Sequence, residues 1–130
     1  MKLDHVAFQV SDMDRSLAFY TQTLGLKLMF DKISQEHRER FAFLALEGGN
    51  LELLEKHDEE GNPIPVGKGE PEPPYCPHVA IGTDNLDAVV ATLEKNGIPT
   101  LKGPLLIENE VRWLYFCDPD NNVLEYVQWL

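Results

Sequence analysis

The sequence predicts an α+β fold made of two tandem copies of a small βαβββ module. The first observation is an internal repeat, because His-Val-Ala occurs at residues 5–7 and again at residues 78–80, 73 positions later. The second is that apolar residues follow strand and helix periodicities in the same order in both copies. Similarity that keeps its order at a fixed offset indicates a structural repeat.

The register of the repeat holds along each copy, with two compensating one-residue shifts. The further matched pairs are Met13-Asp14 with Leu86-Asp87, residues 40–43 with residues 112–115, and Leu51-Glu52 with Leu124-Glu125. We therefore assign residues 1–56 to the first module and residues 76–130 to the second, and we treat the two modules together as one domain.

Local patterns predict the elements of each module. Alternation over residues 3–10 predicts a strand, and apolar residues at helical spacing between 13 and 24 predict a helix that Ser11 caps and Gly25 ends. The closing hairpin is predicted at residues 41–46 and 51–54, after a short strand at 26–30. In the second module, the predicted features are a strand around 79–81, a helix capped by Asp84 and ended by Gly97, and a hairpin at 111–117 and 123–129.

Residues 57–75 separate the two modules. Five of these 19 residues are proline and three are glycine, so regular structure is not expected. A connection of this length inside a compact domain is often functional, and a lid, a partner-crossing arm and a plain spacer all remain open.

The composition limits the partners. A net charge of −11 opposes binding to nucleic acid and to anionic lipid, because both require a clustered basic surface. No run of about 18 apolar residues predicts a membrane-spanning helix, and the N-terminal residues lack the apolar stretch of a signal peptide. With only two cysteines, no disulfide framework is expected. We therefore expect a cytoplasmic protein that binds a small molecule.

Four polar side chains point away from the predicted core. His5 and Glu52 lie opposite apolar neighbours on the first and last strands of the first module, and His78 and Glu125 do the same in the second. Each His precedes its Glu by 47 residues. Two imidazoles and two carboxylates suit a divalent ion such as Ni, Co, Mn, Fe or Zn. Such an ion can polarise a carbonyl group and stabilise an enediolate. His37 and His57 have no repeat partner and are expected at the surface.

The chain resembles the vicinal oxygen chelate superfamily, also called the glyoxalase, bleomycin-resistance and dioxygenase fold, over nearly its whole length. The motifs that carry the resemblance are Leu3-Asp4-His5-Val6-Ala7, residues 14–20, Leu24-Gly25-Leu26, Leu51-Glu52-Leu53, Pro77-His78-Val79-Ala80 and residues 118–125. The resemblance implies sheets that form a partly closed cup around a metal, with helices on the outer face. It also implies the metal ligands His5, Glu52, His78 and Glu125, as in glyoxalase I.

The full ligand set favours a metal-dependent lyase or isomerase of the glyoxalase I type, in which Glu125 is the catalytic base and Glu52 a ligand and possible second base. Alternatives are an epimerase similar to methylmalonyl-CoA epimerase, a non-heme iron dioxygenase, and a metal-free binding protein similar to bleomycin-resistance proteins. Lys56 and residues 105–110 depart from the glutathione-binding pattern of glyoxalase I, so glutathione is not favoured as the thiol.

Further expectations concern the substrate and the assembly. Arg40 and Arg112 occupy equivalent repeat positions, and either one is a candidate to anchor an anionic group of the substrate. Trp113 is a candidate to line the substrate site. A homodimer is expected, because two-module proteins of this size often close their cup against a second chain.

Overall fold

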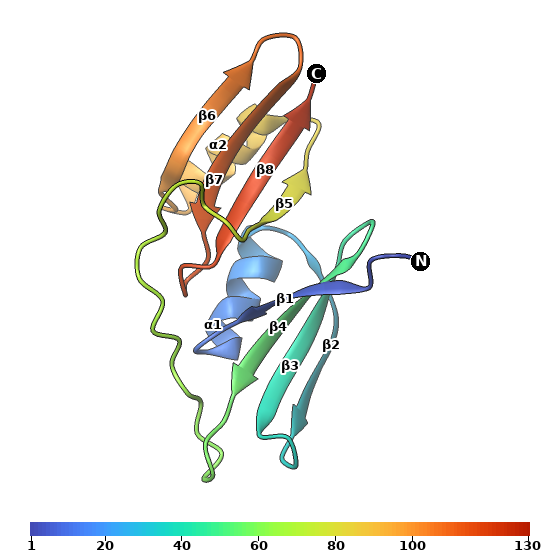
Figure 1. Cartoon of the computed structure of the whole chain (residues 1–130), viewed down its shortest axis with the longest axis vertical. Coiled ribbons are helices and arrows are strands. Elements are labelled where there is room, and N and C mark those ends of the chain that lie inside the picture. Colours follow the sequence, from blue (N-terminus) through green and yellow to red (C-terminus); the bar gives the residue numbers. More distant parts are fainter. The chain divides into compact units, whose positions relative to one another are not determined.

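The computed structural model describes residues 1–130 and divides the chain into two compact units, residues 1–67 and residues 68–130. The division falls inside the segment 57–75. Each unit contains one four-stranded mixed sheet and a short helical segment, and neither sheet closes into a barrel (Figure 1). The α+β fold with tandem βαβββ modules is therefore confirmed.

The first module runs through five elements and a helical extension. Their bounds are β1 His5–Gln9, α1 Met13–Leu17, η1 Ala18–Thr23, β2 Lys27–Ser34, β3 Glu39–Ala45 and β4 Asn50–Lys56. The strands lie in the order β1-β4-β3-β2, and β1 is parallel to β4 while the other pairs are antiparallel. The predicted helix is observed as the five-residue α-helix α1, followed directly by the wider π-helical segment η1.

The second module repeats this arrangement. Its elements are β5 Val79–Gly82, α2 Leu86–Lys95, β6 Thr100–Ile107, β7 Val111–Cys117 and β8 Val123–Trp129. The strand order is β5-β8-β7-β6, again with the first and last strands parallel. Ala7 pairs with Glu52 and Ala80 pairs with Glu125, so both strands of the pair keep the 73-residue offset.

One face of each sheet packs against the helix of its own module (Figure 1). Side chains on this face are almost fully buried, as alternation along the strands predicts. The buried apolar residues of the first module are Phe8, Val10, Met13, Tyr20, Ala42, Leu44, Leu51 and Leu53, and those of the second are Leu86, Leu93, Val111, Leu114, Phe116, Val123, Leu124 and Tyr126. The other face of each sheet carries the polar residues predicted as metal ligands.

Both helices begin one residue later than predicted. The N-caps are Asp12 and Asn85, whose side-chain oxygens accept hydrogen bonds from the backbone N–H groups of Arg15 and Ala88. The prediction of Ser11 and Asp84 as caps was wrong. The Ser11 hydroxyl instead accepts a bond from the Val66 N–H. Asp12 and Asn85 occupy equivalent repeat positions, so the capping device is itself repeated.

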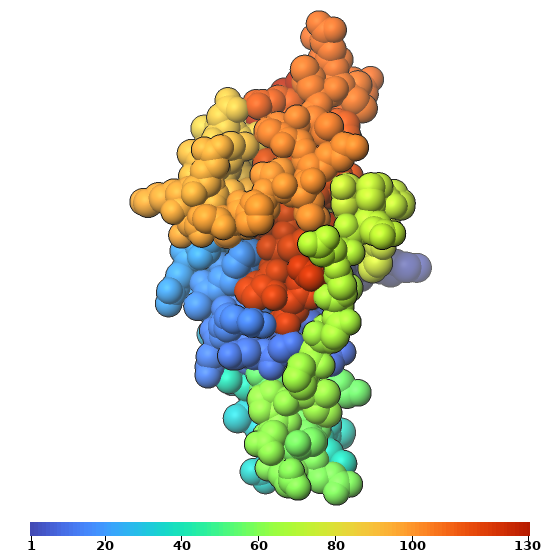
Figure 2. All heavy atoms as spheres, turned by 90° about the vertical axis from the view of Figure 1, so that its left-hand side faces the viewer, coloured from blue at the N-terminus to red at the C-terminus, as the bar shows by residue number.

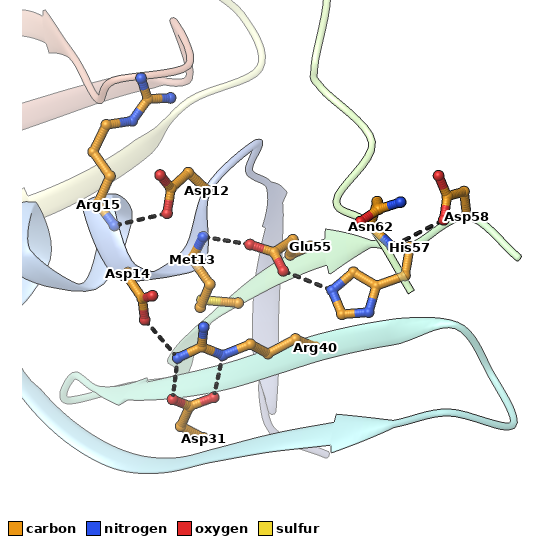
Figure 3. Close-up of polar contacts among 10 residues, drawn as sticks. All are labelled: Asp12, Met13, Asp14, Arg15, Asp31, Arg40, Glu55, His57, Asp58 and Asn62. Atoms are coloured by element: carbon orange, nitrogen blue, oxygen red, sulfur yellow. Dashed lines mark hydrogen bonds and ion pairs between the residues drawn. The ribbon is translucent and has the colours of Figure 1, made fainter. Parts of the chain in front are cut away.

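The last strand of each module supplies a second cap. In the first module, the buried Glu55 carboxylate accepts a 2.5 Å hydrogen bond from the Met13 N–H at the start of α1 (Figure 3). In the second module, the Gln128 side-chain oxygen accepts a 3.0 Å bond from the Leu86 N–H. These two N–H groups have no partner within their helices, so each contact satisfies a donor that would otherwise be unpaired.

Both helical segments end where glycine was predicted to end them. Gly25 and Gly97 have φ values of 77° and 68°, in the left-handed region that other residues adopt at an energetic cost.

The segment 57–75 contains no strand or helix apart from an isolated bridge between His57 and Pro63. It lies at the surface (yellow-green in Figure 2). None of the helices in the chain has the length and apolar character that crossing a membrane requires.

Candidate functional site

The first pair of predicted ligands lies on the face of the first sheet that the helix leaves uncovered. His5 opens β1, and Glu52 stands in the middle of the neighbouring strand β4. The His5 Nε2 atom lies 3.6 Å from the Glu52 Oε1 atom. The Glu52 side chain is 16% exposed and that of His5 is 38% exposed, so the pair is open to solvent mainly from the histidine side.

The second pair has the same geometry. His78 immediately precedes β5, and Glu125 lies on the neighbouring strand β8. The His78 Nε2 atom is also 3.6 Å from a Glu125 carboxylate oxygen. The structure therefore brings each predicted histidine to its own predicted glutamate, at the same 3.6 Å separation in both modules.

The other ring nitrogen of each histidine has an acceptor of its own. His5 Nδ1 lies 2.7 Å from the Asp4 carboxylate, and His78 Nδ1 lies 3.0 Å from the Tyr75 carbonyl oxygen. The Cys76 thiol is 4.0 Å from His78 Nδ1, but it has the Pro74 carbonyl oxygen at 3.6 Å as a closer acceptor. Both contacts are made by a proton on Nδ1, and in a neutral ring with that proton the Nε2 lone pair lies on the side of the glutamate.

An aromatic ring packs beside each histidine. The Phe43 ring centroid is 4.9 Å from that of His5, and the Tyr115 centroid is 5.4 Å from that of His78. Phe43 also stacks on Phe30 at 4.8 Å, and Tyr115 contacts Tyr75 at 5.0 Å. These rings were not predicted as site residues. Their positions on the same strand face as Glu52 and Glu125 were the available signal, because Phe43 pairs with Glu52 and Tyr115 with Glu125.

The donor atoms suit a divalent ion. Bonds of about 2.1 Å from one ion to a nitrogen and an oxygen span up to about 4.2 Å, so a separation of 3.6 Å allows both atoms to bind the same ion. Each module provides two such donors. No group of three or more His, Cys, Asp or Glu side chains arranged to hold an ion occurs in the chain. Each module therefore supplies one nitrogen and one oxygen donor, a combination that suits a divalent ion.

The two arginines predicted as substrate anchors lie on the opposite, helix-packed face of their sheets. Arg40 donates two hydrogen bonds to Asp31, at 3.0 and 2.8 Å, and forms an ion pair with Asp14 of α1 at 2.9 Å (Figure 3). These carboxylates, Asp31 foremost, raise the pKa of Arg40 above its ordinary value. Arg112 pairs in the same way with Asp87 of α2 at 2.8 Å. Both guanidinium groups therefore connect sheet to helix, and neither joins a His–Glu pair.

Trp113 lies on the open face of its sheet. It pairs with Val127, two residues from Glu125 along β8, and it is half-buried. A contact between Trp113 and substrate stays a prediction.

The prediction of His57 as a surface residue was wrong. Its side chain is 11% exposed, and its Nε2 atom lies 2.6 Å from the Glu55 carboxylate that caps α1 (Figure 3). Glu55 continues the alternation of Leu51 and Leu53 on the buried face of β4, and this pattern was the signal for a buried carboxylate in need of a partner. His37 is exposed, as expected.

Comparison with known proteins identifies the family. The family model described as "Glyoxalase/Bleomycin resistance protein/Dioxygenase superfamily" matches residues 2–126. A lactoylglutathione lyase of Schizosaccharomyces pombe is 31% identical over 144 residues, covering 97% of this chain and 47% of the yeast protein. The chain thus spans about half the length of that relative.

Two further relatives differ in their described activities. The human mitochondrial methylmalonyl-CoA epimerase is 27% identical, covering 91% of this chain and 66% of the human protein. The crystal structure of TnmS3, an antibiotic binding protein from Streptomyces sp. CB03234, has a TM-score of 0.74 at 24% identity and covers 100% of this chain and 97% of that one. The likeness to TnmS3 establishes the shared fold alone.

Proposed function

Because the chain belongs to the glyoxalase, bleomycin resistance protein and dioxygenase superfamily, we propose that it is a metal-dependent lyase or isomerase of the glyoxalase I type. The proposed reaction moves a proton on a carbon next to a carbonyl group of a small α-oxygenated substrate. The similarity to a lactoylglutathione lyase supports this reaction class.

The observation that carries the proposal is the arrangement of acceptors in each His–Glu pair. In a neutral imidazole with its proton on Nδ1, the Nε2 lone pair faces a carboxylate oxygen 3.6 Å away, too far for a hydrogen bond. Two electron-rich atoms placed side by side are stabilised by a cation that binds both. The same arrangement occurs in both modules, which makes a chance contact a poor explanation.

The residues proposed to hold the ion are His5, Glu52, His78 and Glu125. Neutral imidazole nitrogen and carboxylate oxygen suit Ni, Co, Mn, Fe or Zn. A bound ion of this kind supplies Lewis acidity that polarises a carbonyl oxygen and acidifies the neighbouring C–H group.

We assign the proton transfer to Glu125. Its carboxylate is 15% exposed on the open face of the second sheet. Tyr115 is its partner on β7, and Trp113 pairs with Val127, two residues further along β8. Glu125 removes the proton from the carbon next to the carbonyl group and returns a proton to the product. Glu52 is assigned as a ligand first and as a possible second base.

The substrate is proposed to contact the aromatic side chains of the open sheet faces. Trp113 and Tyr115 offer flat apolar surface next to the proposed base. The thiol carried by the substrate need not be glutathione, because Lys56 and residues 105–110 depart from the glutathione-binding pattern. A homodimer is the proposed assembly, and a cytoplasmic location is proposed with it.

A second candidate is an epimerase acting on an acyl-CoA ester. The similarity to methylmalonyl-CoA epimerase favours it. Proton removal beside a thioester carbonyl requires the same ion and the same base, so the two candidates share one site and differ in the substrate.

The test is proton exchange at the substrate carbon in D₂O, followed by NMR. Metal-loaded and metal-stripped protein are compared on hemithioacetals of 2-oxoaldehydes with several thiols, and on 2-methyl-branched acyl-CoA esters. We expect deuterium incorporation with one substrate class and only with metal. Absence of metal-dependent exchange on every substrate of both classes would refute the proposed function.

A further inference from the structure

Asp4 makes a contact that its module partner does not reproduce. Its carboxylate lies 2.7 Å from Nδ1 of His5, the ring nitrogen that faces away from Glu52. At the equivalent position of the second module stands Pro77, which has no side-chain acceptor. There the His78 Nδ1 atom uses the Tyr75 backbone carbonyl oxygen at 3.0 Å instead.

The two acceptors differ in charge. An ionised carboxylate forms a shorter hydrogen bond, about twice as strong as one to a neutral carbonyl oxygen. In histidines that bind metals, an acceptor behind the ring fixes the tautomer and raises the basicity of the nitrogen that binds the ion. The two His–Glu pairs are therefore equal in separation but unequal in the group behind the imidazole.

We propose that Asp4 is a positioning residue that keeps the proton of His5 on Nδ1 and so presents the Nε2 lone pair toward Glu52. The inference rests on the proposed metal function for its purpose, but the tautomer itself exists without metal. His5 and His78 therefore differ in the acceptor behind the ring, a carboxylate in one and a backbone carbonyl oxygen in the other.

A purely packing-based explanation makes a different prediction. The Phe43 ring at 4.9 Å restrains the His5 ring plane whether or not Asp4 is present. A restrained plane does not decide which nitrogen carries the proton, so the proton position separates the two explanations. The Asp4 side chain is 74% exposed, and we therefore expect an effect at the low end of the range seen for such partners.

The experiment measures the imidazole tautomers in metal-free protein by two-bond ¹H–¹⁵N correlation, at about pH 8.5, where model imidazoles are neutral. The variants are Asp4→Ala, which removes the acceptor, and Asp4→Asn, which keeps an acceptor oxygen without the charge. Asp84→Ala removes an exposed carboxylate from the second module and is the matched control. The backbone bond from the Asn50 N–H to the Asp4 carbonyl oxygen is retained in both Asp4 variants, so β1 stays paired at this point.

We expect Nδ1-protonated His5 in the wild type, mainly Nε2-protonated His5 in Asp4→Ala, and recovery of the Nδ1 proton in Asp4→Asn. The His78 signals serve as an internal reference and should not change in any variant. An Nε2-protonated His5 in the wild type, or a His5 tautomer unchanged in Asp4→Ala, would overturn the role of Asp4.

A cobalt titration of the same proteins separates this inference from the proposed function. We expect Asp4→Ala to weaken cobalt binding about tenfold, Asp4→Asn to weaken it less, and Asp84→Ala to leave it unchanged. A wild type that binds none of cobalt, nickel, manganese, iron and zinc would refute the metal function, and the tautomer spectra would still decide whether Asp4 positions His5.

Discussion

The two modules place side chains at the same repeat positions but use different chemistry at them. In the first module a buried carboxylate, Glu55, caps the helix and also contacts His57. In the second module the neutral amide of Gln128 caps the helix. By contrast, the two His–Glu pairs are alike in residue type and in their 3.6 Å separation. The helix-capping contact is therefore made by a carboxylate in one module and by an amide in the other, whereas both His–Glu pairs use the same two residue types.

The largest difference between the modules is expected in catalysis. Glu125→Gln removes the proposed base and should lower kcat by about 10³-fold, within the range that general bases contribute. Glu52→Gln removes a ligand oxygen's charge and should cost only about tenfold. Initial rates on the substrate found by proton exchange, at equal metal content, measure both. Full activity of Glu125→Gln would show that this carboxylate is not the base.

The helix caps should differ in their contribution to stability. Glu55→Ala leaves the Met13 N–H and the buried His57 without a partner, and should lower the free energy of unfolding by about 3 kcal/mol. Gln128→Ala leaves the Leu86 N–H and the Asp84 carbonyl oxygen without their side-chain partner. It should lower the free energy of unfolding by about 1 kcal/mol. Urea unfolding of both variants tests the comparison, and equal losses would show that the charge and His57 add nothing.

The two arginines that connect sheet to helix are expected to differ less in their contribution to stability than the two helix caps. Arg40 binds two carboxylates, Asp31 and Asp14, while Arg112 binds Asp87 alone. Arg40→Gln should lower the free energy of unfolding by about 1 kcal/mol, and Arg112→Gln by less. Neither substitution should change KM, because neither side chain lies on the open face of its sheet. A KM raised tenfold or more in either variant would restore the substrate-anchor hypothesis.

The smallest effect concerns the pH dependence of the Arg112 contact. The hydrogen bond from Arg112 holds the pKa of Asp87 below its ordinary value of 3.8. A carboxylate with a lowered pKa in the folded state contributes stability above its ordinary pKa and loses it as the pH falls through the folded value. The difference in unfolding midpoint between wild type and Arg112→Gln should therefore shrink from about pH 5 to about pH 3. A constant difference would contradict the ion pair.

The sequence was sufficient to predict the module, because the repeat and strand alternation both follow from which residues must be buried. It placed His5, Glu52, His78 and Glu125 on the uncovered face for the same reason. Alternation also contained two signals that were not used. Arg40 is in phase with Ala42 and Leu44, and Glu55 is in phase with Leu51 and Leu53, so both belong to the helix-packed face.

Other features depend on contacts that local patterns do not specify. The helix caps were misplaced by one residue because Ser11 and Asp12 are both suitable cap residues, and only the contact of Ser11 with Val66 distinguishes them. The burial of His57 results from a partner two residues away on the strand and a loop that folds back through the Pro63 bridge. The cap position and the burial of His57 are both set by contacts in the tertiary structure.

The central claim is that the two His–Glu pairs bind a divalent ion, and metal titration tests it most directly. Protein purified without chelator and stripped of metal would be titrated with cobalt, nickel, manganese, iron and zinc, alongside His5→Ala and His78→Ala. We predict about one tightly bound ion per chain in the wild type and at least about 100-fold weaker binding in each variant, since each one removes a proposed ligand. Less than about a tenth of an equivalent with every metal, or unchanged binding in both variants, would contradict the account.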